Sequence, residues 1–75
     1  MTSHANATLQ VQVRVNGVPH TLAAPAVLAD ALALAGVAPP FAVAVNRVFV
    51  PRSAYRTHAL AGGDQVEAIR PVTGG

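Results

Sequence analysis

Residues 9–15 alternate between apolar and polar side chains, which is the two-residue period of a β-strand with one buried face. The apolar positions of this run are Leu9, Val11, Val13 and Val15. Asn16-Gly17 follows directly and favours the positive φ angles of a type I′ turn, so we expect Val18 to Leu22 to return as the second strand of a hairpin. Because Pro19 has no amide donor, this second strand is expected at an edge of the sheet.

The next apolar residues follow a helical period. Ala26 to Ala35 predicts an amphipathic helix, with Asp30 pointing away from its apolar face and Gly36 ending it. Pro25 suits the first helical turn, whereas Ala24 is a poor N-cap. The expected apolar face contains Val27 or Leu28, together with Ala31, Leu32 and Ala35.

The second half of the chain predicts short strands. Pro39-Pro40 predicts an extended crossover. The expected order after it is a strand at Phe41 to Val45, a tight turn at Asn46-Arg47, a strand at Val48 to Val50 stopped by Pro51, and a loop with a helical turn over residues 52–60.

A turn at Gly62-Gly63-Asp64 leads into the last predicted strand, residues 65–70. Val66 and Ala68 share one of its faces, and Glu67 and Ile69 share the other. Mixed faces suit a central strand. The whole order predicts an α+β domain in which one helix packs across one face of a mixed sheet of about five strands.

Composition excludes several functional classes. The 75 residues include no cysteine, so a disulfide, a zinc–thiolate site and a catalytic thiol are excluded. His4, His20 and His58 are dispersed, and we predict no metal site. The formal net charge is only +2 and the arginines form no basic stripe with interleaved aromatic residues, which argues against nucleic-acid binding.

Membrane insertion and independent catalysis are also disfavoured. Residues 22–45 are strongly apolar, but alanine supplies much of this character and Gly36 and Pro39-Pro40 interrupt any long helix. The N-terminal residues lack the pattern of a signal peptide, so a cytoplasmic location is expected. Ser53 has no base and orienting residue that can be named with it, so the chain is not expected to be an enzyme.

The C-terminal sequence RPVTGG suggests an accessible carboxylate. Pro71 cannot donate to a strand ladder, so the last strand is expected to end near Arg70. We therefore divide the chain into a flexible extension (residues 1–7), a folded domain (8–70) and a flexible tail (71–75). Glycines lack a Cβ and let a tail enter a narrow cleft, although ordinary domains can also end in small residues.

Four segments resemble the ubiquitin-like β-grasp sulfur carriers of the ThiS/MoaD superfamily, and within them the ThiS family of thiamine biosynthesis. These segments are Val15-Asn16-Gly17, VNRVFVPR at residues 45–52, LAGGDQVE at residues 60–67 and PVTGG at residues 71–75. Together they span nearly everything after residue 8. The resemblance implies a β-grasp fold.

The resemblance also implies a mechanism. A ThiF-like activating enzyme would use MgATP to adenylate the carboxylate of Gly75, and a persulfide donor would convert it to a thiocarboxylate. The sulfur would then pass to a ThiG-like thiazole synthase. Gly74 and Thr73 would thread into the partners' sites, and no cofactor would be bound permanently. Independently of the resemblance, Arg14, on the sheet face expected opposite the helix, and Arg52, which could contact an acidic partner, are the candidate docking residues.

The sequence is also compatible with other functions. The small subunit of molybdopterin synthase shares the fold and the Gly-Gly thiocarboxylate, although the VNRVFVPR run favours the thiamine carrier. A carrier for another sulfur pathway, such as cysteine synthesis, is a further alternative. A β-grasp interaction module with an incidental Gly-Gly end would keep its function after deletion of Gly74-Gly75, whereas a carrier would lose it.

Overall fold

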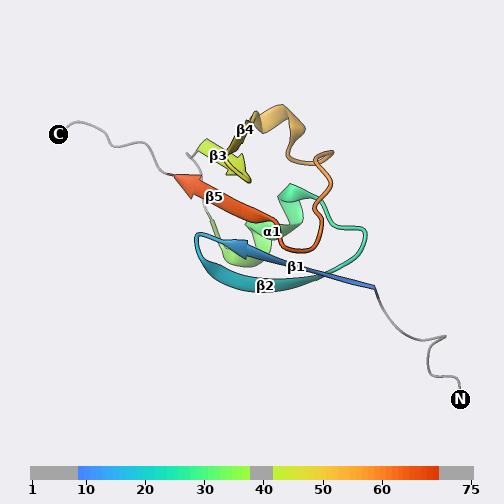
Figure 1. The fold of residues 1–75 in the computed structure, drawn as a ribbon. Helices are drawn as coiled ribbons and strands as arrows, with labels where there is room; N and C mark the ends of the chain where they lie inside the picture. Colours follow the sequence, from blue (N-terminus) through green and yellow to red (C-terminus); the bar gives the residue numbers. More distant parts are fainter. Residues whose placement is uncertain (1–8, 38–41, 70–75) are drawn as a thin grey trace, which may run out of the picture.

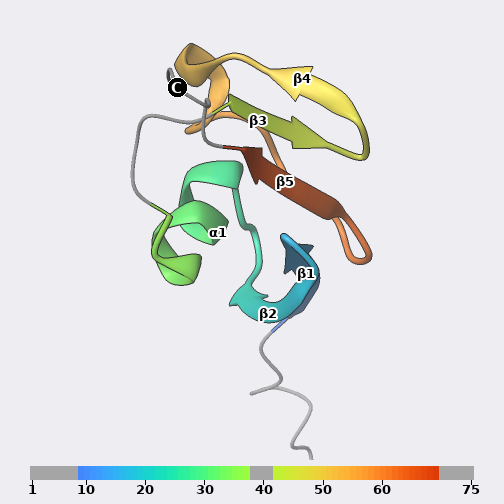
Figure 2. The ribbon, with the colours of Figure 1, turned by 90° about the vertical axis from the view of Figure 1, so that its left-hand side faces the viewer.

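A computed structural model describes residues 9–37 and 42–69, which form one mixed sheet and one α-helix (Figure 1). The sheet has five strands in the order β2-β1-β5-β3-β4, and helix α1 packs against one of its faces (Figure 2). This confirms the predicted α+β architecture. The elements are β1 (Gln10–Val15), β2 (Val18–Ala23), α1 (Leu28–Ala35), β3 (Ala42–Val45), β4 (Val48–Val50) and β5 (Gln65–Ile69).

The first hairpin forms as predicted. Asn16 and Gly17 have φ angles of 52° and 84°, which are the left-handed values of a type I′ turn. β2 pairs with β1 only, and Pro19 lies on this edge strand opposite Arg14. The prediction for Leu9 is wrong: β1 begins one residue later, at Gln10, and the Leu9 side chain before it is 76% exposed.

Helix α1 begins at Leu28, later than predicted, and Pro25 lies before it. The Leu60 amide donates to the Ala26 carbonyl at 2.9 Å, and Val27 forms a β-bridge with Ala59, so this segment is held extended. The exposed Asp30 carboxylate then accepts the Val27 N–H at 3.0 Å and stabilises the first turn. The helix ends at Gly36 as predicted, with a φ of 73°.

The second half also follows the predicted order. β3 and β4 are joined by Asn46 and Arg47, which have φ angles of 51° and 69°. A single 3₁₀ turn at Arg52–Ala54 follows Pro51. β5 lies at the centre of the sheet, parallel to β1 and antiparallel to β3, as its mixed faces predicted. The predicted crossover at Pro39-Pro40, Phe41 of the third strand and Arg70 of the last strand lie outside the described residues.

The hydrophobic core lies between α1 and the sheet. Leu28 from the helix and Val13, Val43 and Val66 from three strands are almost completely buried. The other buried residues are Val11, Val15, Leu22, Ala26, Ala31, Leu32, Val45, Val50 and Leu60. One sheet face is therefore used for folding, and the opposite face has no covering layer among the described residues (Figure 2). Within residues 9–37 and 42–69, no helix is long and apolar enough to cross a bilayer.

Candidate functional site

The predicted sulfur-bearing residue Gly75 and its neighbours Gly74 and Thr73 lie outside the described residues. The same is true of the predicted extension at residues 1–7 and the tail at 71–75, so these divisions remain predictions. The last described residue before them is Ile69, which ends β5.

β5 has a strand on each side, but the two neighbours cover different lengths of it. On one side, β3 pairs with it from Val45↔Val66 to Ala42↔Ile69. On the other, β1 pairs with it only at Arg14↔Gln65 and Val15↔Val66. The segment that precedes the tail is therefore the central strand of the sheet and is fixed by the surrounding fold.

The side chains of two turn asparagines complete this pairing. The Asn16 carboxamide accepts the Ala68 N–H at 2.9 Å and donates to the Ala68 carbonyl at 3.3 Å. At the other end of β5, Asn46 Oδ1 accepts the Gln65 N–H at 3.0 Å, and its Nδ2 donates to Asp64 Oδ1 at 2.9 Å. Each asparagine has a positive φ, which this residue tolerates better than most others. The sequence analysis identified both turns but missed these side-chain contacts.

The sheet face away from α1, here named the open sheet face, carries both polar and apolar side chains. Gln10, Gln12 and Arg14 are exposed, as expected for the strand positions that alternate with buried valines. Phe49 and Glu67 both pair with Ala44, so the three share one row on this face. Phe49 is 66% exposed and Ile69 61% exposed. Phe49 was missed as a candidate because its position depends on strand register.

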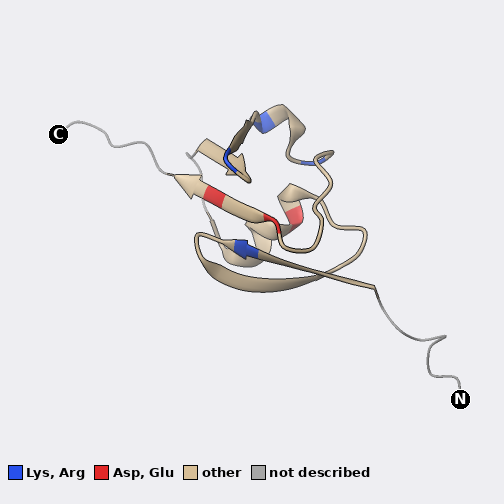
Figure 3. Cartoon of the chain, in the orientation of Figure 1, with Lys and Arg blue, Asp and Glu red and all other residues tan. Residues whose placement is uncertain are grey.

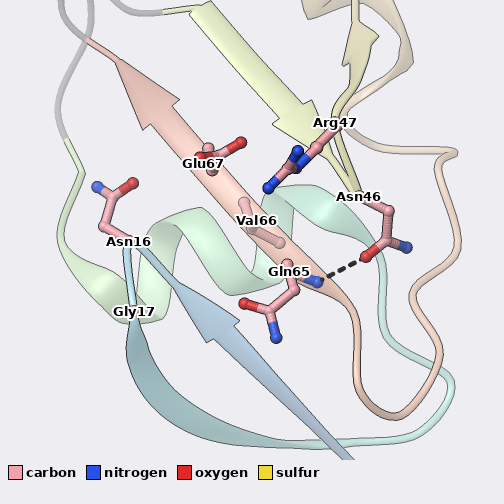
Figure 4. Close-up of a pocket in the computed structure, with 7 residues that line it drawn as sticks. All are labelled: Asn16, Gly17, Asn46, Arg47, Gln65, Val66 and Glu67. Atoms are coloured by element: carbon pink, nitrogen blue, oxygen red, sulfur yellow. Dashed lines mark hydrogen bonds between the residues drawn. The ribbon is translucent and has the colours of Figure 1, made fainter.

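A polar hollow crosses β5 between the two turns (Figure 4). Its lining includes Arg47, which reaches from the β3–β4 turn toward β5, and Glu67 on β5 itself (Figure 4). The remaining lining residues are Asn16, Gly17, Asn46, Gln65 and Val66. This set can exchange hydrogen bonds and charge with a partner surface, but it contains no nucleophile paired with a base.

The two predicted docking arginines lie on different parts of the molecule. Arg14 borders a hollow beside the Gly62-Gly63 turn. Arg52 begins the 3₁₀ turn and borders another hollow with Ser53 and Arg56. β5 and β3 separate β1 from β4, and the basic residues are dispersed over the domain (Figure 3). The structure therefore does not bring Arg14 and Arg52 into one site.

Potential metal ligands are dispersed in the part of the chain that the structure describes. No three histidine, aspartate or glutamate side chains within residues 9–37 and 42–69 lie close enough to share a metal ion. His20 is on edge strand β2 and His58 is in the loop after the 3₁₀ turn, and both are partly buried. Ser53 is exposed on that turn.

Comparison with protein families shows which family the chain matches. The model of the ThiS family matches residues 13–75, which is most of the chain and includes the Gly-Gly end. The chain belongs to the ThiS family. ThiS proteins are the sulfur carriers of thiamine biosynthesis and are not themselves enzymes.

A solved structure supports the same assignment. The crystal structure of the thiamine biosynthesis protein ThiS from Geobacter metallireducens superimposes with a TM-score of 0.71 at 28% sequence identity. The match covers 87% of this chain and 100% of that one. The predicted ThiS-like β-grasp fold is therefore confirmed. No curated protein matches the sequence.

Proposed function

We propose that this ThiS-family chain carries sulfur for thiazole formation as a thiocarboxylate on Gly75. The observation that carries the proposal is the family match, which extends through Thr73, Gly74 and Gly75. The fold supports it because β5, the central strand, ends at Ile69, a few positions before these residues in the sequence. C-terminal residues that follow the central strand of the sheet are presented to partners from a well-held position.

The proposed chemistry proceeds in balanced steps. The Gly75 carboxylate attacks the α-phosphorus of MgATP in a ThiF-like activating enzyme, forming an acyl adenylate and releasing pyrophosphate. The terminal sulfur of a persulfide donor then displaces AMP and forms an acyl disulfide. A thiol reduces the S–S bond and leaves the thiocarboxylate, which gives its sulfur to a ThiG-like thiazole synthase. In this scheme the chain supplies no catalytic group and binds no permanent cofactor. All of these steps take place in the cytoplasm.

We further propose that the activating enzyme docks on the open sheet face. This face combines exposed Phe49 and Ile69 with charged Arg14, Arg47 and Glu67, the mixture of apolar and charged contacts that is typical of transient interfaces. β5 is part of this face and precedes the tail in the sequence, so binding there would bring the tail close to the partner's active site. Arg52 follows β4, which β5 and β3 separate from β1, and is assigned to a separate contact.

Pyrophosphate exchange tests the adenylation step directly. The full chain is incubated with a ThiF-like enzyme, MgATP and labelled pyrophosphate, and the carrier-dependent formation of labelled ATP is measured. Deletion of Gly74-Gly75 should abolish exchange, and replacing both glycines by alanine should reduce it strongly because each new Cβ must enter the cleft. Both variants should unfold at the same urea concentration as the wild type. Undiminished exchange with the deletion variant would contradict the proposal.

A further inference from the structure

The side chain of Asn16 occupies the position of a missing strand beside the end of β5. Its Oδ1 accepts the Ala68 N–H at 2.9 Å and its Nδ2 donates to the Ala68 carbonyl at 3.3 Å. Only one orientation of the carboxamide satisfies both bonds, because a backbone amide only donates and a carbonyl only accepts. The pair satisfies both backbone groups of Ala68, as an antiparallel neighbouring residue would.

The side chain takes this place because β1 ends before it reaches the end of β5. Its parallel pairing with β5 stops at Val15↔Val66, and the chain then turns away at Gly17. The Asn16 backbone N–H still reaches the Val66 carbonyl at 2.8 Å. Asn16 thus holds β5 at two successive positions, Val66 through its backbone and Ala68 through its side chain.

We propose that Asn16 is a positioning residue that sets where the tail leaves the fold. The inference rests on the proposed function, since it assigns a role in presenting Gly75 to the activating enzyme. Ala68 is the second-last residue of β5, so the Asn16 contacts hold the end of the strand that precedes the predicted tail. Without them, β3 alone would hold Ala68 and Ile69 through the pairs Val43↔Ala68 and Ala42↔Ile69. The end of β5 would then sample more conformations, and each productive encounter would require it to be ordered again.

Asn46 offers a closely matched control within the same sheet. It also has a positive φ, its N–H donates to the Gln65 carbonyl at 2.8 Å, and its Oδ1 accepts the Gln65 N–H at 3.0 Å. These contacts hold the beginning of β5, at the end opposite the tail. In both turns glycine tolerates the backbone conformation, so Asn16→Gly and Asn46→Gly each remove side-chain bonds without adding backbone strain.

Amide hydrogen exchange of the full-length chain tests whether Asn16 holds the end of β5. The rate at Ala68 is divided by the rate at Leu28, whose N–H bonds to the His58 carbonyl at 2.9 Å, a contact that involves neither asparagine nor its bonding partners. A loss of global stability raises both rates together and leaves this ratio unchanged. Asn16→Gly should raise the ratio about tenfold, the effect of losing roughly one net hydrogen bond, whereas Asn46→Gly should leave it as in the wild type. An unchanged ratio in Asn16→Gly would overturn the inference.

Steady-state adenylation tests the positioning role. Asn16→Gly should raise the KM of the activating enzyme for the chain about 3- to 10-fold at unchanged kcat. Asn46 lines the same hollow but holds the beginning of β5, so Asn46→Gly should raise the KM less. Equal KM values for both variants would show that Asn16 is merely structural. Failure of the wild-type chain to be adenylated would instead contradict the proposed function. The exchange ratio would still decide whether Asn16 holds β5.

Discussion

Replacing Leu28 by alanine should destabilise the domain strongly, because its side chain is completely buried between α1 and the sheet. A fully buried Leu→Ala change costs about 3 kcal/mol, within a range of roughly 2.7 to 5. A chain of 75 residues is expected to have a total stability of roughly 4 to 11 kcal/mol. The change therefore removes a large fraction of the total, and the melting temperature should fall by about 12 to 24 °C.

Leu34→Ala is the matched control, since Leu34 lies on the same helix but is 53% exposed. It should cost less than about 1 kcal/mol, because much of the side chain already contacts water. The chain has no tryptophan, so urea unfolding is best followed by circular dichroism. Equal losses for the two variants, or a loss below about 1 kcal/mol for Leu28→Ala, would refute the assignment of Leu28 to the core.

Three further substitutions test other parts of the account. Asp30→Ala should lower the free energy of unfolding by about 1 kcal/mol in urea titrations, because the Val27 N–H loses its acceptor at the start of α1. Gly36→Ala should cost about 1 kcal/mol by the same assay through backbone strain alone, since a Cβ there meets no atom within 4 Å but the φ is 73°. Arg14→Glu on the open sheet face should slow carrier-dependent pyrophosphate exchange severalfold, with Arg56→Glu as the exposed control. Unchanged exchange in Arg14→Glu would count against docking on that face.

Features determined by neighbouring residues were predictable from the sequence. Asn16-Gly17 specifies its hairpin through the φ angles that the turn requires, and Gly36 ends the helix for a similar reason. The mixed faces of residues 65–69 correctly predicted a central strand. In each case the physical cause lies within a few residues of the feature.

Features that depend on distant segments were not predictable in the same way. The helix starts at Leu28 because Ala26 and Val27 pair with residues 59–60, which the local sequence around Pro25 does not reveal. Asn16 contacts Ala68, which is 52 positions away, and nothing in either segment indicates the pairing. The exposed apolar side chain of Phe49 joins the open sheet face only because of the register of β4 on β3. The predicted roles of the tail are supported by family membership, and a direct chemical measurement is needed to test them.

The most direct test of the central claim is mass spectrometry of the intact chain and of its C-terminal peptide after incubation with the activating enzyme, MgATP and a persulfide donor with a thiol reductant. Alkylation before digestion traps a thiocarboxylate and separates it from oxidation of Met1, which has nearly the same nominal mass change. The account predicts an alkylated adduct localised to Gly75. An unmodified Gly75, obtained with an activating enzyme that modifies another carrier under the same conditions, would contradict it.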